Sequence, residues 1–247
     1  MDRLIYTAVS GMNASMMRER MIASNMSNAQ TIGFRAEIMQ ATPITIDGPQ
    51  VDVRAMTRTE VKGASMREGA VIDTHRNLDI AMQGDAMLAV QSLDGEEAYT
   101  RRGDLSISAT GLMENGEGLP VLGQNGPITV PPGSDVSIAP DGGVMVSDPA
   151  VPDQLPQQID KLKLVSTTGT KIEKDLAGVF RVVGGGALPT NEDARVISGA
   201  LEQSNVKTTE VLVEMIEAQR LFDLRTKLVQ TAKELDEGSS RLMRLDS

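Results

Sequence analysis

The chain of 247 residues contains no cysteine and a single histidine, His75. The lack of thiols excludes disulfide bonds, iron–sulfur clusters, thiolate zinc sites and cysteine nucleophiles. A zinc site at His75 would need three additional carboxylate ligands. Tryptophan is absent, and three Phe and two Tyr are too few for base-stacking platforms or sugar-gripping surfaces. We therefore expect no cofactor, no metal site and no catalytic residue.

Positive charge is also scarce, because 24 Lys and Arg face 34 Asp and Glu, for a formal net charge of -10. Binding to nucleic acid is driven by clustered Lys and Arg, so no nucleic-acid partner is expected. The acidic excess falls in residues 41–199, which we interpret as the solvated part of the chain.

Long apolar runs are missing as well. The sequence has no stretch of about 18 apolar residues that could form a membrane-spanning helix. Near the N-terminus, Ser10, Asn13 and the charged residues 18–20 interrupt the apolar pattern, so we expect no cleaved secretory signal.

Proline is confined to the middle of the chain, since all 11 prolines lie between Pro43 and Pro189. Both ends are therefore free to be helical. Near the N-terminus, apolar residues recur every three or four positions and predict a helix of about 25 residues. These residues are Leu4, Ile5, Ala8, Val9, Met12, Met16, Ala23 and Met26. Gly11 and several Ser and Asn weaken this helix, which must gain its stability by packing against something else.

The C-terminal segment carries a leucine repeat with seven-residue spacing. Its members are Leu221, Leu228, Leu235 and Leu242, flanked by Val211, Met215, Ala218, Phe222, Leu224, Val229 and Ala232. This pattern predicts a long helix over about 205–244. Because both ends carry apolar stripes, we expect the terminal helices to pair as a coiled-coil-like core.

The middle of the chain has a different period. Short β-type runs such as residues 78–82, 87–90 and 128–130 alternate with Gly-Asp, Asn-Gly and Asp-Gly turn signals. Such dense turns predict antiparallel hairpins. The expected fold class is thus α+β, with long N- and C-terminal helices and a central antiparallel β-rich domain. The expected parts are an N-terminal helix at 1–30, an extended connector at 31–75, a β-rich domain at 76–198 and a C-terminal helix at 199–247.

The asparagine-rich segment between Asn25 and Phe34 is predicted to end the first helix. Asn and Gly adopt left-handed backbone conformations, and Asn caps helix ends. We expect Asn25, Asn28 and Gly33 to redirect the chain and Phe34 to anchor it against apolar neighbours.

Three blocks of sequence carry a resemblance to a known family. They are residues 1–11 with 23–35, then 77–81 with 84–85, 99–103 and 138–142, and finally 199–206 with 215–220. In this order they resemble the axial rod proteins of the bacterial flagellar basal body, and within that family the proximal-rod type. Two positions depart from the family pattern: residues 86–88 lack its aromatic pair, and 221–223 read Leu-Phe-Asp instead of Ala-Tyr-Glu.

The resemblance implies a structural subunit, not an enzyme. Its terminal helices would assemble with other rod proteins and with copies of itself into a tubular drive shaft that transmits torque. The flagellar type III apparatus would export it, without a cleaved signal peptide, to the rod in the periplasm. The resemblance adds Leu201, Gln203 and Asn205 to the expected assembly residues, which otherwise are Ile5, Val9, Met12, Met16, Asn25, Asn28, Gly33, Phe34, Met215, Phe222, Leu228 and Leu235.

Other functions stay open at this point. Within the same family, a distal-rod or hook-type axial subunit is the main alternative. A secreted β-rich enzyme acting on cell-wall sugars could draw a carboxylate pair from Asp85, Asp94, Asp104 and Asp141, although all four lie in turns. An unrelated coiled-coil binding module would account for the two ends but not for the central motifs. No small-molecule substrate is expected.

Overall fold

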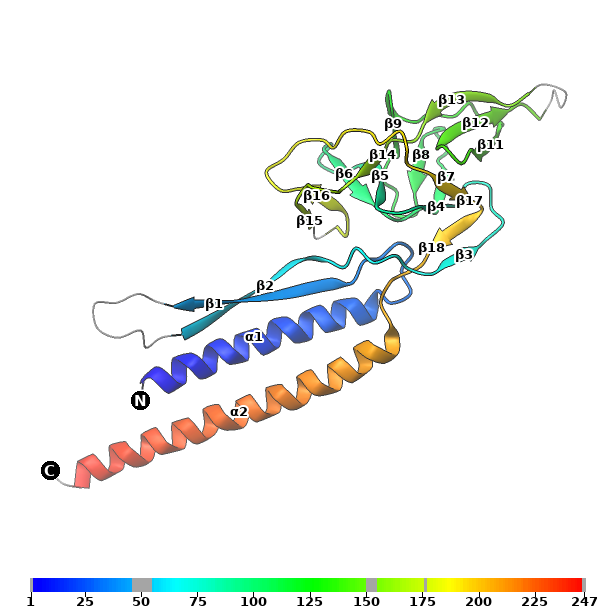
Figure 1. Cartoon of the computed structure of the whole chain (residues 1–247). Helices are drawn as coiled ribbons and strands as arrows, with labels where there is room; N and C mark the ends of the chain where they lie inside the picture. Colours follow the sequence, from blue (N-terminus) through cyan, green and yellow to red (C-terminus); the bar gives the residue numbers. More distant parts are fainter. Residues whose placement is uncertain (1, 46–54, 150–154, 176, 246–247) are drawn as a thin grey trace. The chain divides into compact units, whose positions relative to one another are not determined.

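The computed structural model describes residues 2–45, 55–149, 155–175 and 177–245, and the side chains of 9–39, 63–149, 155–175, 177–231, 233 and 234. The chain forms two compact units (Figure 1). The helical unit comprises Met1–Ser27, Glu37–Lys62 and Lys207–Ser247, and the β unit comprises Asn28–Ala36 and Gly63–Val206.

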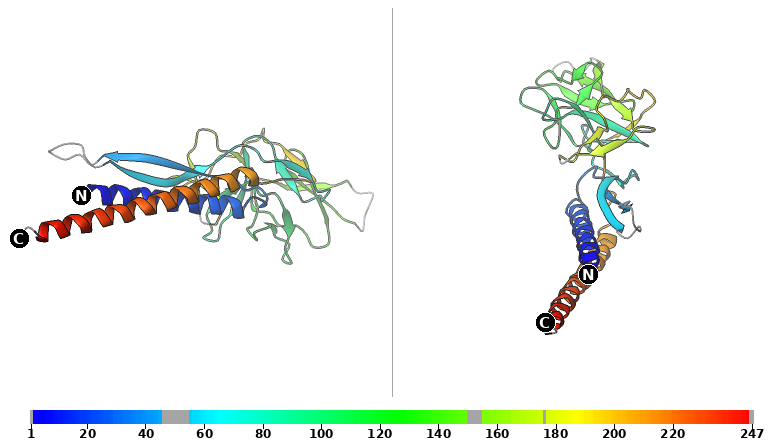
Figure 2. Two further views of the ribbon diagram at one scale, coloured as in Figure 1. Left: turned by 90° about the horizontal axis from the view of Figure 1, so that it is seen from below. Right: turned by 90° about the vertical axis from the view of Figure 1, so that its left-hand side faces the viewer.

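The helical unit is built from two helices and one pair of long strands. Its elements are α1 (Asp2–Ser27), β1 (Glu37–Thr45), β2 (Ala55–Ala64) and α2 (Thr208–Leu245). Helix α1 contacts both β1 and α2, and lies between them within this unit (Figures 1 and 2). Over the described residues, neither helix is apolar for long enough to cross a bilayer.

The expected fold class, with terminal helices paired as a coiled-coil-like core, is wrong. The described residues form two helices against eighteen strands, and the paired strands are antiparallel. The leucine repeat of α2 does not supply the seam that the prediction requires, because Leu228 is 66% exposed and the neighbouring Leu224 is 59% exposed. Apolar side chains at this spacing form a core only where a facing helix covers them.

The contact between α1 and α2 uses a different face of α2. Arg225 donates hydrogen bonds to the carbonyl oxygen of Gly11 and to the hydroxyl of Ser15. Ala218 and Val211, seven and fourteen residues earlier, are buried on the same face, since seven residues are about two helical turns. Small and polar groups of α1 therefore meet α2.

The β unit consists of short strands joined by tight turns. Its strands are β3 (Val71–Asp73), β4 (Ile80–Met82), β5 (Ala86–Gln91), β6 (Glu97–Thr100), β7 (Leu105–Ile107), β8 (Met113–Asn115), β9 (Leu122–Gly123), β10 (Gly126–Pro127), β11 (Asp135–Ile138), β12 (Gly143–Ser147), β13 (Gln157–Lys161), β14 (Leu164–Ser166), β15 (Ile172–Lys174), β16 (Phe180–Val182), β17 (Val196–Ser198) and β18 (Ala200–Glu202). The segment expected as a connector, 31–75, thus contains β1, β2 and β3.

A five-stranded sheet in the order β14-β5-β6-β16-β15 organises this unit. Strand β5 is buried on both faces, which explains its unbroken apolar sequence. Because successive side chains of a strand point to opposite faces, Leu88 and Val90 enter the larger apolar core while Met87 and Ala89 enter a smaller one. The smaller core also contains Tyr99 of β6.

Candidate functional site

The N-terminal helix presents apolar side chains away from its buried face. Val9 and Met16 are each 39% exposed, and Met12 is half-buried. Ser15 and Ile22 are buried instead. Ile5 also belongs to α1, but its side chain lies outside the described residues.

Helix α2 exposes a broader apolar face. Large side chains that are between 45% and 66% exposed are Leu212, Val213, Ile216, Leu224 and Leu228. At about 100° per residue these five side chains spread over about 160° of the helix surface. Val213 and Ile216 lie roughly opposite buried Val211 and Ala218, and Leu228 lies beside the buried face. Met215 and Phe222 are half-buried. The side chain of Leu235 lies outside the described residues.

Asn25 ties the last turn of α1 to the first residue of β1. Its Nδ2 donates to the carbonyl oxygen of Glu37 at 3.1 Å, and its Oδ1 accepts from the backbone nitrogen of Glu37 at 2.8 Å. The side-chain amide thus satisfies both backbone groups of Glu37, as a neighbouring strand would. Asn25 is 5% exposed, so this connection is shielded from water.

In the β unit, Asn205 joins two segments that are far apart in sequence. Its Oδ1 accepts from the nitrogen of Ala36 at 2.7 Å, and its Nδ2 donates to the carbonyl oxygens of Ser65 and Arg67 at 2.9 and 2.7 Å. Its own backbone nitrogen donates to the carbonyl oxygen of Phe34 at 3.2 Å. The side chain and the backbone of Asn205 together therefore fix residues 34–36 beside 65–67.

Gly33 lies against the backbone that directly follows β6. Its φ is +66°, and a Cβ there would lie 2.4 Å from the carbonyl carbon of Arg101. The position therefore accepts only glycine without a shift of the backbone. The next residue, Phe34, is half-buried, and the Nζ of Lys174 lies 3.5 Å from its ring centroid. Asn28 accepts hydrogen bonds from the backbone nitrogen and the hydroxyl of Thr31.

The remaining predicted residues belong to or follow β18. Leu201 is half-buried and pairs with Ile72 of β3. Gln203 is exposed, and its backbone nitrogen donates to the carbonyl oxygen of Ala70 at 2.8 Å. Together with Asn205, these residues place the segment 201–205 along residues 67–72.

A buried ion cluster, absent from the sequence-based predictions, lies at this place. The carboxylate of Glu202 is 2.8 Å from Nη2 of Arg35 and 2.7 Å from Nε of Arg101, and it also accepts from the nitrogen of Gly69 at 2.7 Å. Each of the three charged side chains is about 2% exposed. We call Arg35, Arg101 and Glu202 the Arg–Glu junction.

The junction binds further backbone groups. Arg101 donates to the carbonyl oxygens of Gly84 at 2.8 Å and Met82 at 2.9 Å, and Arg35 donates to that of Arg67. Burial lowers the pKa of Arg35 from its ordinary value, while Glu202 opposes that shift. Burying three charges is costly unless they are paired and hydrogen-bonded. Here one carboxylate pairs with two guanidinium groups, and Nε of Arg35 has no hydrogen-bond partner among the described residues.

The members of the Arg–Glu junction come one from each of the three sequence blocks. The signal available in the sequence was polarity in an otherwise apolar setting: Glu202 follows Ala200 and Leu201 in a strand, and Arg101 follows the apolar end of β6. The periodicity of apolar residues along the sequence does not by itself distinguish such buried charged residues from solvent-facing ones.

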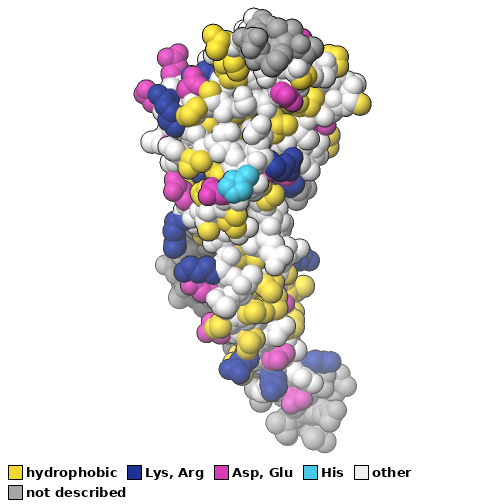
Figure 3. All heavy atoms as spheres, turned by 90° about the vertical axis from the view of Figure 1, so that its right-hand side faces the viewer, with side chains coloured by type: hydrophobic (Ala, Val, Ile, Leu, Met, Phe, Trp, Pro, Cys, Tyr) yellow, Lys and Arg dark blue, Asp and Glu magenta, His cyan; other side chains and the backbone are white. Residues whose placement is uncertain are grey.

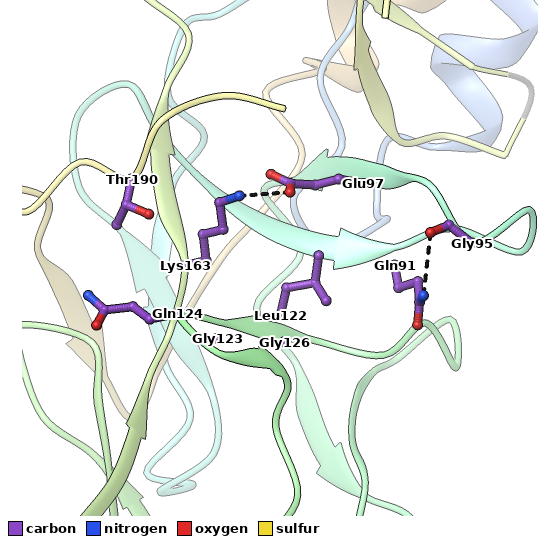
Figure 4. A pocket seen from close by; sticks show the side chains of 9 residues that line it. All are labelled: Gln91, Gly95, Glu97, Leu122, Gly123, Gln124, Gly126, Lys163 and Thr190. Atoms are coloured by element: carbon purple, nitrogen blue, oxygen red, sulfur yellow. Dashed lines mark hydrogen bonds and ion pairs between the residues drawn. The ribbon is translucent and has the colours of Figure 1, made fainter. Parts of the chain in front are cut away.

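In the described residues, the histidine is exposed and the two charged side chains that line a hollow are paired with each other. His75 is exposed, with a left-handed backbone at φ 60°, and is the cyan side chain in Figure 3. No group of three His, Cys, Asp or Glu there could hold a metal ion. A hollow of about 360 Å³ is lined by Gln91, Gly95, Glu97, Leu122, Gly123, Gln124, Gly126, Lys163 and Thr190 (Figure 4). Its two charged side chains, Glu97 and Lys163, pair with each other at 2.7 Å.

Two family models match the chain. The first, described as the flagellar hook protein FlgE/F/G D1 domain, covers residues 81–146, and the second, described as the flagellar basal body rod FlgEFG protein C-terminal, covers residues 197–242. Arg101 lies in the first match and Glu202 in the second.

Full-length relatives give the same picture. The chain is 35% identical to the flagellar basal-body rod protein FlgF of Salmonella typhimurium, over 98% of this chain and 99% of that protein. Identity to FlgF of Escherichia coli is 34%, over 99% and 98%. Identity to the flagellar basal-body rod protein FlgG of Bacillus subtilis is 30%, over 95% and 97%.

Proposed function

Because the chain belongs to the flagellar basal-body rod protein family and is a structural subunit of the flagellar rod, we propose that it assembles through the exposed apolar faces of α1 and α2. Neighbouring rod proteins and further copies of this chain cover these faces in the assembled rod. The rod so formed is a tubular shaft that transmits torque.

The outer face of α2 is the observation that carries this proposal. Leu212, Val213, Ile216, Leu224 and Leu228 face solvent in the single chain. Burial of one such side chain contributes roughly 1.5–3 kcal/mol, so a neighbour that covers this face gains a large driving force. Val9 and Met16 extend the apolar surface to α1.

The other predicted assembly residues act by positioning the chain. Asn25 holds the end of α1 to β1, while Gly33 and Asn205 fix the segments that precede β1 and α2 in sequence. Phe34 and Leu201 pack within the β unit. In our proposal these residues orient the backbone that leads to the contacting helices and do not themselves touch a neighbouring subunit.

We assign no catalytic role to the chain. Charged groups that could supply one are engaged with each other: Arg102 binds Asp104 at 2.7 Å, and Lys163 binds Glu97. Family membership supports export by the flagellar type III apparatus and a place in the periplasmic part of the basal body. The proposed partners are proteins, with no nucleic acid, cofactor or small-molecule substrate.

The test is Leu228→Glu in motile cells, with Gln157→Glu, at an exposed position of β13, as the control for an added negative charge. A carboxylate introduced at 228 would be buried without a partner in every subunit contact, at several kcal/mol each. We expect Leu228→Glu cells to lack complete rods and not to swim, although the purified full-length subunit melts at the wild-type temperature.

Gln157→Glu and His75→Ala cells should swim normally. Intact basal bodies in Leu228→Glu cells would contradict assembly through this face. Loss of motility in His75→Ala cells that still build rods would contradict the purely structural role.

A further inference from the structure

The loop 92–96 between β5 and β6 presents one leucine to solvent. Leu93 is 91% exposed, although a leucine gains by burial. Its neighbour Ser92 is buried, and the strands on either side belong to the central sheet of the β unit. The exposed side chain of Leu93 therefore belongs to a loop whose two ends are fixed in the central sheet.

The loop itself is held by a network of short-range hydrogen bonds. The nitrogen of Ser92 donates to the carbonyl oxygen of Glu96 at 2.9 Å, and that of Gly95 donates to the carbonyl oxygen of Ser92 at 2.9 Å. Asp94 Oδ1 accepts from the nitrogen of Glu96 at 3.1 Å. Gly95 takes the left-handed conformation that the turn needs, with φ +85°.

Arg181 of β16 fixes the loop from the neighbouring strand. Its guanidinium lies 2.7 Å from the carboxylate of Asp94, 2.9 Å from that of Glu96 and 3.1 Å from that of Asp175. It also donates to the hydroxyl of Ser92 at 2.8 Å. Its hydrogen bond lowers the pKa of Asp94, which keeps that carboxyl ionised.

Negative charge exceeds positive charge in the loop that carries Leu93. Asp94 and Glu96 share one guanidinium, that of Arg181, and their side chains are 50% and 75% exposed. Their outer oxygens remain accessible to a cation from outside the chain. A fixed apolar side chain with ionised neighbours suits a partner that combines apolar and basic groups.

The hollow of about 360 Å³ adjoins the same loop, because Gly95 and Gln91 line it (Figure 4). Gly123 and Gly126 line it as well, and glycine permits close approach of another backbone. Gln124 offers an amide group that can bind peptide groups, whereas the Nε2 of Gln91 already donates to the carbonyl oxygen of Gly95 at 3.4 Å (Figure 4). The hollow is thus suited to an extended polypeptide and not to a compact apolar ligand.

We propose that the loop 92–96 and the adjoining hollow form a docking surface for an extended segment of a different protein, in which a Lys or Arg neighbours an apolar side chain. The apolar side chain packs on Leu93, the basic one binds Asp94 and Glu96, and the backbone lies in the hollow. A second copy of this chain is disfavoured as the occupant, since the acidic excess of the sequence falls in residues 41–199. This surface belongs to the β unit and goes beyond the helix contacts proposed above.

The experiment places a photo-crosslinking amino acid, p-benzoylphenylalanine, at position 93 of the full chain in cells that build flagella. The crosslinked peptide is sequenced from purified basal bodies. We expect it to come from another protein and to contain Lys or Arg within about two residues of the crosslinked side chain. Leu155, which is 84% exposed outside this surface, is the matched control and should crosslink at least fivefold less.

Adding Asp94→Asn and Glu96→Gln to the crosslinking variant should lower the yield at least threefold. The amide oxygen that Asp94→Asn introduces can still accept the turn hydrogen bond, but the negative charge is lost. A crosslink to a copy of this chain, a crosslink to an acidic segment, an unchanged yield in the double variant, or a yield no higher than at 155 would each overturn the proposal. Rod assembly is followed in parallel through Leu228→Glu, so a failure of the helix contacts is distinguished from a failure of this surface.

Discussion

The two units of the chain differ in how large an apolar core they form. In the β unit, Ile80, Leu88 and Leu105 are fully buried, and even strand β5 is covered on both faces. In the helical unit, Leu224 and Leu228 remain more than half exposed. The β unit has therefore completed its core within one chain, whereas the helical unit leaves much of its apolar surface exposed in the single chain.

The units also differ in where they place polar contacts. The β unit encloses the Arg–Glu junction, whose charges are paired inside the fold. The contact between α1 and α2 depends on Arg225, which binds Gly11 and Ser15. Among the described residues of the helical unit, the buried apolar side chains are those of Ile22, Val211 and Ala218, a far smaller core than that of the β unit. We therefore expect a single chain to hold the β unit more firmly than the helical unit.

Amide hydrogen exchange on the free full-length subunit gives the largest expected contrast. Amides of β5 should exchange only on global unfolding, while those of α2 between Leu212 and Leu228 should exchange through local opening. We expect the α2 amides to exchange about 10⁴-fold faster, equivalent to about 5.5 kcal/mol. Equal protection of β5 and α2 would contradict the expected difference in stability between the two units. In assembled rods, the exchange rates of the two segments should become similar.

The next largest effect concerns the stability of the β unit. Glu202→Gln removes the carboxylate that pairs with Arg35 and Arg101 and leaves two guanidinium groups buried together. We expect a loss of about 3–5 kcal/mol in the free energy of unfolding, measured by urea denaturation of the full chain with fluorescence of a label on the β unit.

Glu192→Gln is the matched control at an exposed glutamate and should change stability by less than about 0.5 kcal/mol. If Glu202→Gln were equally mild, the junction would not stabilise the β unit.

A smaller effect is expected at alkaline pH, through Tyr99. Its hydroxyl donates to Glu97 at 2.9 Å and accepts from the nitrogen of Leu188 at 2.6 Å. Burial raises its pKa to about 12. The pKa of tyrosine in the unfolded chain is about 10. The neutral phenol therefore stabilises the fold fully below pH 10, and this stabilisation is lost as the pH rises to about 12.

Between pH 10 and 12, the free energy of unfolding of the wild type should therefore fall by roughly 2 kcal/mol more than that of Tyr99→Phe. Urea denaturation at each pH measures both values. All other titrating groups are the same in the two proteins, so their effects cancel when the two free energies of unfolding are subtracted. A constant difference across this range would show that Tyr99 ionises equally in both states.

The sequence was sufficient for the family and the structural role, and both predictions are confirmed by the relatives. It was not sufficient for the fold class. Leu221 and Leu228 repeat every seven residues, but periodicity reports which residues share a face and not what covers that face. The face that meets α1 carries Val211, Ala218 and Arg225, and half-buried Val229 is aligned with Val211 five turns further on.

The Arg–Glu junction shows a second limit of sequence reasoning. Arg35, Arg101 and Glu202 are separated by 66 or more positions in the chain, and each alone is typical of a solvated surface. Only the tertiary fold reveals that each charge has its partner. Gly33 is different, because a glycine in an asparagine-rich segment already indicates an unusual backbone conformation.

The contacts between residues 33–36 and 202–205 also have a mechanical consequence. Gly33 binds the carbonyl oxygen of Glu202, Arg35 binds its carboxylate, and Ala36 binds the side chain of Asn205. A force that pulls these two segments apart would load all three connections in parallel, so none can rupture while the others stay relaxed. These contacts hold the segment that precedes β1 to the segment that precedes α2. A force applied to either segment is therefore shared by both.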